Sequence, residues 1–226
     1  MAEIAVLVPV LDRPHRAAPL ADAFRAATPA GIYRLVFLCS LEDPAEYEAC
    51  NQTGELTLTV PWPAGPGDWA RKINHGYRHT TEPWMLCGAD DLLPHPGWAE
   101  AALRLADPGV GVIGTNDLGN PTVMAGKHST HPLVARWYAD EHGTVDGPGR
   151  VVTEAYGHQW TDTELVQTAM SRGAWVFAAD SHVRHAHPFW TKGPMDATYE
   201  KGMASSREDQ RLFARRKSLW SGRRVV

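Results

Sequence analysis

The sequence predicts an α/β protein of one domain, in which a mostly parallel central sheet is flanked by helices. Short apolar runs alternate with segments of helical periodicity along the first part of the chain, which is the pattern of strands joined by right-handed crossovers. The 226 residues are 43% hydrophobic and 21% charged, as in globular domains with a substantial core. The apolar runs are only a few residues long, so we expect no membrane span.

The first predicted elements are, in order, a strand at 4–10, a helix at 16–27, a strand at 33–39, a helix at 44–50, a strand at 56–60, a helix at 69–79 and a strand at 84–87. Three of these strands are continuous apolar runs, which is typical of strands covered on both faces. The run at 56–60 alternates Leu and Thr, which favours a place near an edge. Asp68 follows a Pro- and Gly-rich loop and is a good N-cap for the next helix.

The remaining elements are predicted as a helix at 97–106, a strand at 110–115, a short helix at 132–138, a helix at 161–172, a strand at 175–178 and an amphipathic helix at 206–220. Apolar residues in 161–172 repeat at helical spacing, and Gly173 suits the position just beyond a helix end. Residues 118–131 and 189–205 show little periodicity and are expected to be loops.

Cysteine usage and charge restrict the functional classes. Cys39, Cys50 and Cys87 show no CxxC spacing, and two of them lie in predicted strands, so we expect buried, reduced thiols in a cytoplasmic protein. The N-terminus lacks the basic region of a signal peptide. The net charge of −4 argues against binding of nucleic acid mainly by bulk charge.

Two adjacent carboxylates, Asp90 and Asp91, follow the apolar strand at 84–87. The carboxyl end of a central strand is where open α/β sheets bind ligands. Neighbouring carboxylates repel each other, and a divalent cation with a preference for oxygen ligands, Mg²⁺ or Mn²⁺, would make the arrangement favourable. The alternative is that an Asp caps the helix that follows.

Four segments stand in an informative order: Val8-Pro9-Val10; Ala70-Arg71-Lys72-Ile73-Asn74; Gly88-Ala89-Asp90-Asp91; and Thr161-Asp162-Thr163-Glu164-Leu165, followed by Gly173 and His185-Ala186-His187-Pro188. Together they resemble a family 2-type glycosyltransferase of the GT-A fold. The matching family features are the opening strand, the helix before the metal strand, the Asp-x-Asp-Asp metal motif, and the catalytic acidic helix with its later histidine. The resemblance covers residues 4–188, and the small size fits a compact enzyme such as bacteriophages carry.

The resemblance implies transfer of a sugar, with inversion, from a nucleotide-sugar to an acceptor hydroxyl, with UDP-sugars favoured. It divides the single domain 1–226 into a nucleotide-sugar half (1–91), an acceptor and catalytic half (92–188), and a lid with a C-terminal helix (189–226). The sequence departs from the family where Gly88 replaces the first Asp of the metal motif. In the family that Asp commonly contacts the ribose of the donor, so here the ribose contacts would come from other residues.

The resemblance also implies the metal ligands. Mn²⁺ or Mg²⁺ would be held by Asp90 and Asp91, with His185 as a further ligand or, alternatively, in a packing or surface role. His187 would point to the same side of an extended strand, but a surface or packing role is preferred for it. A histidine ligand would favour Mn²⁺, because imidazole suits transition metals.

Donor contacts are implied for residues after the first two strands, on the helix at 69–79, beside the metal motif and in the lid: Pro9, Val10, Asp12, Arg13, Asp43, Arg71, Lys72, Asn74, Gly88, Ala89, Trp190 and Lys192. For Arg71 and Lys72 the alternative is a solvated helix face, the usual place of such residues. Residues 189–201 would form a lid that orders over bound donor, or else a plain loop.

Asp162 is the expected general base, with Glu164 beside it. The neighbouring acid would raise the pKa of Asp162, whereas the helix N-terminus would lower it. The alternative is that Asp162 only caps its helix.

The acceptor is open, and a hydroxymethylated pyrimidine in DNA is one candidate. Its support in the sequence is a basic tail, for which a solvated amphipathic helix is the preferred interpretation. The tail consists of Arg207, Arg211, Arg215, Arg216, Lys217, Arg223 and Arg224. Two other functions compete. A nucleotidyltransferase would be expected to carry a Gly-rich loop after the first strand, and residues 11–16 contain no glycine; the other competitor is a non-catalytic nucleotide-sugar-binding subunit.

Overall fold

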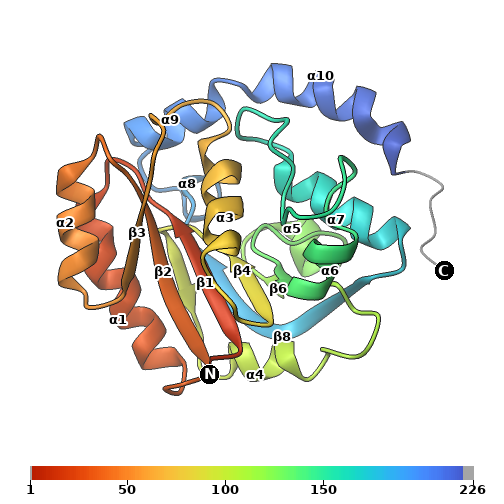
Figure 1. Cartoon of the computed structure of the whole chain (residues 1–226), viewed down its shortest axis with the longest axis horizontal. Coiled ribbons are helices and arrows are strands. Elements are labelled where there is room, and N and C mark those ends of the chain that lie inside the picture. The colour runs from red at the N-terminus through yellow and green to blue at the C-terminus, as the bar shows by residue number, and fades with distance from the viewer. Residues whose placement is uncertain (1, 221–226) are drawn as a thin grey trace.

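An eight-stranded sheet in the order β3-β2-β1-β4-β7-β6-β8-β5 runs through the molecule (Figure 1). The computed structural model describes residues 2–220. The strands are β1 (Ile4–Pro9), β2 (Tyr33–Ser40), β3 (Leu56–Val60), β4 (Trp84–Cys87), β5 (Leu92–Pro94), β6 (Val112–Asn116), β7 (Leu133–Ala135) and β8 (Trp175–His185). Arg223 and Arg224 of the predicted basic tail lie outside the described residues.

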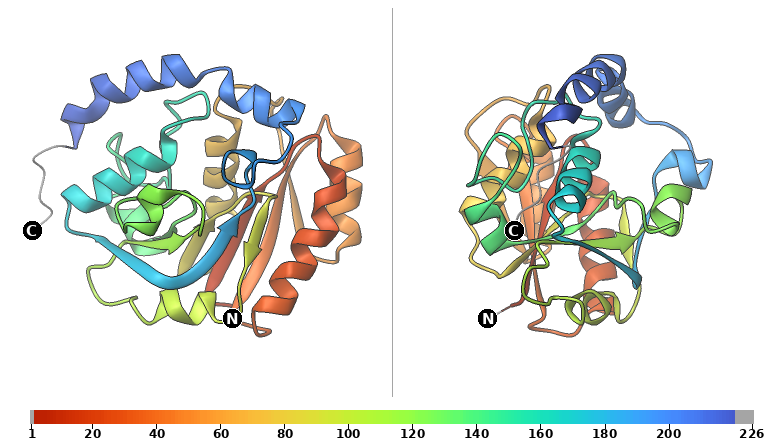
Figure 2. Two further views of the ribbon diagram at one scale, coloured as in Figure 1. Left: turned by 180° about the vertical axis from the view of Figure 1, so that it is seen from behind. Right: turned by 90° about the vertical axis from the view of Figure 1, so that its right-hand side faces the viewer.

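The helices cover both faces of this sheet. They are α1 (Ala17–Ala27), α2 (Pro44–Gln52), α3 (Asp68–Arg78), α4 (Trp98–Leu103), α5 (Pro121–Met124), α6 (Arg136–Glu141), α7 (Thr161–Ser171), α8 (Pro188–Thr191), α9 (Ala197–Met203) and α10 (Ser206–Arg216), with short 3-10 turns at Pro14–Arg16 and Lys217–Leu219. Helices α3, α6 and α7 lie on one face and α1 on the other (Figures 1 and 2).

Strands β1 to β4 pair in parallel around β1, as the alternating pattern of the first part of the chain predicts. Residues 4–8 of β1 are fully buried, because β2 and β4 flank the strand and helices cover its faces. β3 lies at the edge of the sheet, as its alternating sequence predicts. The carboxyl ends of β1, β2 and β4 therefore meet at one edge of the core.

The second half of the sheet corrects three predictions. Residues 132–138 are not a helix throughout: β7 pairs antiparallel with both β4 and β6, and α6 begins only at Arg136. A three-residue run carries too little periodicity to separate strand from helix, so the neighbouring strands decide. β8 extends to His185, well beyond the predicted end at residue 178, and its last residues pair with the unpredicted strand β5.

The segment after β8 is more ordered than predicted. Residues 189–205, expected to be a loop, contain most of α8 and all of α9. Asp196 caps α9 by accepting hydrogen bonds from the backbone N–H groups of Thr198 and Tyr199, at 3.0 and 3.1 Å. α9 and α10 pass along one side of the molecule (Figure 1).

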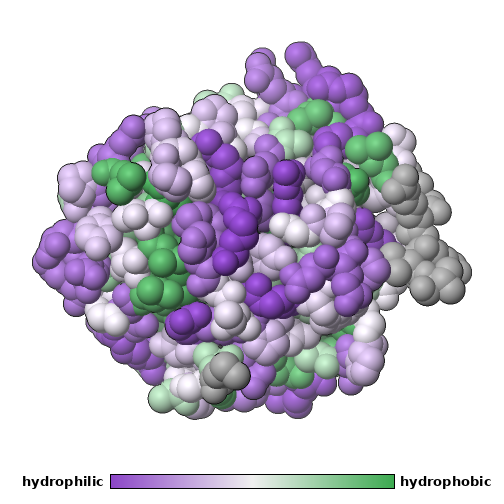
Figure 3. Space-filling view, in the orientation of Figure 1, coloured by the Kyte–Doolittle hydropathy of each residue, from purple (hydrophilic) through white to green (hydrophobic). Residues whose placement is uncertain are grey.

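Surface and thiol chemistry agree with a globular domain. Cys39, Cys50 and Cys87 are free and buried, as predicted. On the face seen in Figure 3, hydrophobic residues form small groups, one of them in the region of β3, among mainly hydrophilic ones. Within residues 2–220, no helix combines the length and apolar character needed to cross a membrane.

Candidate active site

A cavity of about 730 Å³ opens where the carboxyl ends of β1, β2 and β4 meet. Its walls come from the segments after these strands, the start of α3, residues 157–162, the end of β8 and α9. Both Asp90 and Asp91 line it, and so does Asp162. The fold thus brings together carboxylates that lie more than seventy positions apart in the sequence.

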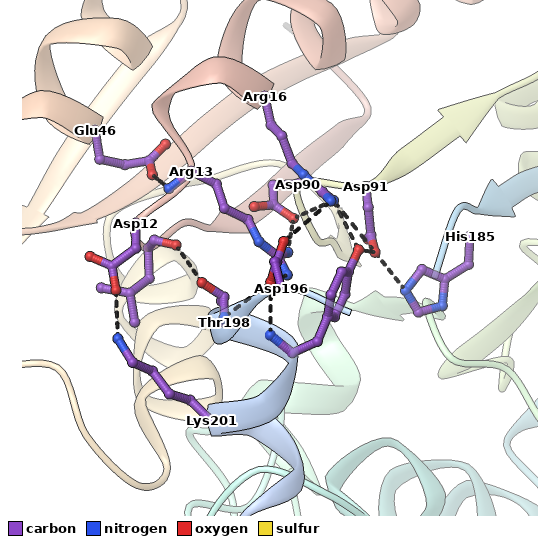
Figure 4. Close-up of polar contacts among 12 residues, drawn as sticks. Asp12, Arg13, Arg16, Glu46, Asp90, Asp91, His185, Asp196, Thr198 and Lys201 are labelled. Carbon is purple, nitrogen blue, oxygen red and sulfur yellow. Dashed lines mark hydrogen bonds and ion pairs between the residues drawn. The ribbon is translucent and has the colours of Figure 1, made fainter. Parts of the chain in front are cut away.

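Asp90 is held by arginines from the segment after β1. The Arg13 guanidinium donates to Asp90 Oδ1 at 2.9 Å, and Arg16 Nη1 lies 3.5 Å from the same oxygen (Figure 4). The Asp90 side chain is only 8% exposed. Burial, together with the charge of Asp91, raises the pKa of Asp90 despite the two arginines.

Asp91 has different partners. Tyr199 donates its hydroxyl to Asp91 Oδ2 at 2.7 Å, and His185 Nε2 lies 3.3 Å from the same oxygen. Burial acts to raise the pKa of Asp91, but His185 and Tyr199 outweigh it and hold that pKa well below its usual range. Within residues 2–220, the other carboxylate oxygen, Oδ1, is buried and finds no hydrogen-bond partner.

Helix α9 closes over this part of the cavity. Asp196 accepts from Arg13 at 2.7 Å (Figure 4). The Tyr199 ring packs against the same guanidinium, with its centroid 3.8 Å from the guanidinium carbon. Lys201 forms an ion pair with Asp12 at 2.7 Å. Burial and the charge of Asp91 raise the pKa of Tyr199 to about 12, so its hydroxyl remains a donor at neutral pH.

Asp162 lies in the first turn of α7. Trp160, at φ 71°, precedes the helix as its N-cap residue, so Asp162 lies two residues further in than the capping position. Asp162 Oδ1 accepts from the Thr163 backbone N–H at 2.7 Å, and Oδ2 lies 3.2 Å from His128 Nε2. Burial acts to raise the pKa of Asp162, but His128 and Thr163 lower it below its usual value.

Glu164, predicted beside the base, faces away from the cavity. Its side chain is 2% exposed and is paired with Arg216 of α10 at 2.8 Å, while Tyr156 donates its hydroxyl to it at 2.6 Å. Helical geometry explains the correction, because residues two apart point to different sides of a helix. Glu164 therefore anchors α10 to α7 in this structure.

The predicted donor residues divide into two groups. Seven line the cavity: Pro9, Val10, Asp12, Arg13, Asp43, Lys72 and Ala89. Lys72 is 1% exposed, donates to the Val10 carbonyl at 2.8 Å and pairs with Asp68 at 2.9 Å, so the solvated-face alternative is wrong for it.

Among the described residues, the other five predicted donor contacts lie outside the cavity lining: Arg71, Asn74, Gly88, Trp190 and Lys192. Asn74 is fully buried and hydrogen-bonds the backbone at Val151 and Val152. Gly88 is needed for packing, because a Cβ there would lie 2.7 Å from the Leu7 carbonyl oxygen. A side chain at position 88 would push β4 away from β1.

The loop before β7 supplies two histidines that the sequence reasoning missed. His128 contacts Asp162, and His131 lines the cavity with its Nδ1 2.8 Å from the Cys87 carbonyl oxygen. That contact places the proton on Nδ1; the opposite nitrogen, Nε2, is buried and without a partner among residues 2–220. Burial and the charge of His185 lower the pKa of His131 to about 4.

Tyr199, Asp196 and Arg16 were also missed, since each reaches the site from a segment without a recognised motif. For His128 and His131, the signal in the sequence is two histidines three positions apart within an otherwise aperiodic segment. In the described part of the chain, no three His, Cys, Asp or Glu side chains already stand together as a metal-binding group.

Comparisons with known proteins identify the fold. No protein-family model and no curated protein matches the chain. A mannosyltransferase from Pyrobaculum calidifontis, in complex with GDP-Man and Mn²⁺, aligns with a TM-score of 0.69 and 17% identity over 99% of this chain. Glucosyl-3-phosphoglycerate synthase from Mycobacterium tuberculosis, in complex with Mn²⁺, UDP and phosphoglyceric acid, aligns with a TM-score of 0.59 and 15% identity over 95% of this chain.

The alignments cover 66% of the mannosyltransferase and 78% of the synthase, so this chain spans about two thirds of the former. The alignment with the mannosyltransferase covers 99% of this chain, so it includes the sheet of parallel and antiparallel strands and the helices that flank it. The chain therefore has the GT-A fold of glycosyltransferases.

Proposed function

We propose that this protein is a metal-dependent, family 2-type glycosyltransferase that moves a sugar from a nucleotide-sugar to an acceptor hydroxyl with inversion. The observation that carries the proposal is the placement of the Asp90–Asp91 pair and of Asp162 in the wall of one cavity, from two different elements. UDP-sugars are the favoured donors. GDP-sugars are the alternative donors, because the structure of the aligned mannosyltransferase contains GDP-Man.

The residues present fit a divalent cation. Asp91 offers a buried carboxylate oxygen without a partner among residues 2–220, and His185 Nε2 stands beside the other oxygen. Asp90 would join them once Arg13 turns toward another anion. Mn²⁺ or Mg²⁺ held by Asp90, Asp91 and His185 would stabilise the charge that grows on the departing diphosphate.

The chain's own residues would do the rest. Arg13 and Arg16 now neutralise Asp90, and both could turn to the donor's phosphates when the metal replaces them. Asp162 would take the proton of the attacking hydroxyl. Helix α9 would exclude water, since its Tyr199 and Lys201 line the cavity.

A binding experiment tests the donor side. Thermal unfolding is followed with UDP-, GDP- and dTDP-sugars, each with Mn²⁺ and with EDTA. A shift that needs both donor and metal is expected, and it should be lost in Asp90→Asn and in Asp91→Asn. Asp22→Asn is the matched control, because the Asp22 side chain is 74% exposed on α1. A full shift in both site variants would contradict the proposal.

The products separate the competing functions. A glycosyltransferase releases a nucleoside diphosphate, whereas a nucleotidyltransferase releases inorganic pyrophosphate. A non-catalytic binding subunit would show the thermal shift and release neither. Detection of UDP or GDP that depends on Mn²⁺ and on Asp162 is the expected result.

A hydroxymethylated pyrimidine in DNA is kept as a candidate acceptor. Its support is the row of exposed cations Arg207, Arg211 and Arg215, which recur every fourth residue along α10. Arg216 does not belong to this row, since it pairs with Glu164. Transfer to an oligonucleotide with 5-hydroxymethylcytosine, but not to one with cytosine, is the test. The cytoplasmic location and bacteriophage origin stay predictions.

A further inference from the structure

The partner of Asp162 is a histidine from another element. His128 Nε2 lies 3.2 Å from Asp162 Oδ2, and the two side chains are 13% and 24% exposed. A carboxylate oxygen only accepts, so the shared proton belongs to His128 Nε2. His128 does not itself line the cavity within the described residues, whereas Asp162 does. His128 therefore stands behind Asp162 as seen from the cavity.

Each of the three residues that follow His128 is held by a hydrogen bond. Ser129 hydrogen-bonds the backbone of Thr115, Thr130 donates to Asp117 at 3.1 Å, and His131 is fixed on the Cys87 carbonyl. These contacts tie the segment to β6 and β4. Loops usually move more than the elements they join, but this one is anchored well enough to hold a side chain in one orientation.

Asp162 keeps room for a further proton donor. Its Oδ1 accepts from the Thr163 backbone N–H at 2.7 Å and lies 3.3 Å from the Thr163 hydroxyl, while Oδ2 accepts from His128. A carboxylate has about four lone-pair positions. Oδ2 thus retains a position for the hydroxyl of an acceptor in the cavity.

We propose that His128 is a positioning residue for Asp162: it fixes the carboxylate toward the cavity, and its charge sets how strong a base Asp162 is. The inference rests on the proposed transfer reaction. In that reaction the acceptor oxygen bonds to the anomeric carbon, the bond from that carbon to the diphosphate oxygen breaks, and the acceptor proton passes to Asp162. His128 keeps its own proton throughout.

The charges around His128 predict a pH signature. Two acids act on it, Asp162 from α7 and Asp117 from the turn after β6. Burial lowers the pKa of His128, but Asp162 and Asp117 more than offset it and raise that pKa above 6.5. When His128 loses its proton, Asp162 becomes more basic and the neutral ring still donates Nε2–H. The kcat of transfer should therefore rise as pH passes through the pKa of His128.

Two variants separate orientation from charge. His128→Gln places an uncharged N–H near the former Nε2, so kcat should stay within a few-fold of wild type while the inflection disappears. His128→Ala removes the contact, and kcat should fall ~10–100-fold through misorientation of the base. The KM for donor should be unchanged in both. His95→Gln, at an exposed histidine beside α4, is the control and should keep the full pH profile.

An NMR titration measures the pair without any turnover. The His128 ring in the wild-type protein should titrate above 6.5, and Asp162→Asn should lower that pKa. An unchanged pKa, a wild-type kcat in His128→Ala or a retained inflection in His128→Gln would each overturn the inference. The titration is independent of transfer, so failure of the proposed function is distinguishable from failure of the histidine–aspartate pair.

Discussion

The two carboxylate clusters of the cavity are held in different ways. Asp90 is neutralised by Arg13 from the segment after β1, and Asp91 accepts a hydrogen bond from the Tyr199 hydroxyl of α9. Asp162 is held by His128 from a loop that is itself hydrogen-bonded to the sheet, and by the first turn of its own helix.

This difference separates exchangeable partners, which surround Asp90 and Asp91, from permanent partners, which hold Asp162. A cation that enters the Asp90–Asp91 side can bind the Asp91 Oδ1 that has no partner among residues 2–220, but at Asp90 it has to replace the guanidinium of Arg13. Nothing on the Asp162 side has to leave, because the carboxylate already faces the cavity. One side of the site is therefore built to change partners, and the other to stay oriented.

The largest expected effect is on the permanent side. Asp162→Asn keeps the shape of the side chain but removes the proton acceptor, and general-base assistance is worth ~10²–10⁴-fold in rate. Transfer should fall by that factor, while the donor-dependent thermal shift stays near normal. Transfer within a few-fold of wild type, or loss of donor binding together with activity, would show that Asp162 is not the base.

The next effect concerns the anchor of α10 on α7. Arg216→Ala leaves the buried Glu164 carboxylate without its cation, and breaking a buried ion pair costs about 3 kcal/mol or more. Denaturant unfolding should show that loss of free energy. Arg215→Ala, at an exposed neighbour, is the control and should change stability by less than ~0.5 kcal/mol. Equal effects of the two variants would contradict the anchoring role.

Acid should destabilise the folded protein through the buried ring of His131. His131 has a folded pKa of about 4 against an ordinary 6.5, so between these values the unfolded chain binds a proton that the folded chain does not. Stability is thus lost as pH falls from 6.5 toward 4, and this one group accounts for about 2 kcal/mol at pH 5.

Variants assign the acid loss to its source. His131→Asn can still donate to the Cys87 carbonyl but does not titrate, so its stability should fall less between pH 7 and pH 5 than that of wild type. His75 and His187 also have pKa values of about 4 and act in the same direction, so part of the loss should remain. An unaltered pH dependence in His131→Asn would exclude His131 as its source.

The smallest effect tests whether α9 is a lid. Tyr199→Phe removes the hydrogen bond to the Asp91 carboxylate, which is worth ~1.5 kcal/mol or about tenfold in an opening equilibrium. Limited proteolysis within residues 189–201 should be faster by that factor, with Tyr47→Phe on α2 as the control. In wild type, donor with Mn²⁺ should slow the cleavage. Equal cleavage with and without ligand would argue against a lid.

Much of the site's framework can be predicted from local stretches of the sequence. The apolar runs of β1, β2 and β4 and the helices between them lie in continuous stretches, so periodicity alone places Asp90 and Asp91 at the carboxyl edge of a parallel sheet. Asp162 in the first turn of α7 follows from the helical spacing after residue 161. Buried thiols and an edge position for β3 follow from composition in the same way.

Only the tertiary structure decides which partner each charge receives. Arg13 meets Asp90 across 77 positions of sequence, Tyr199 meets Asp91 across 108, and Arg216 meets Glu164 across 52. The strand state of residues 133–135 is likewise set by β4 and β6 on either side. Periodicity reports which face of an element is apolar. The partner of a buried charge depends instead on how distant elements pack. The free-energy cost of burying a charge is offset by whichever opposite charge or hydrogen-bond donor the fold brings near.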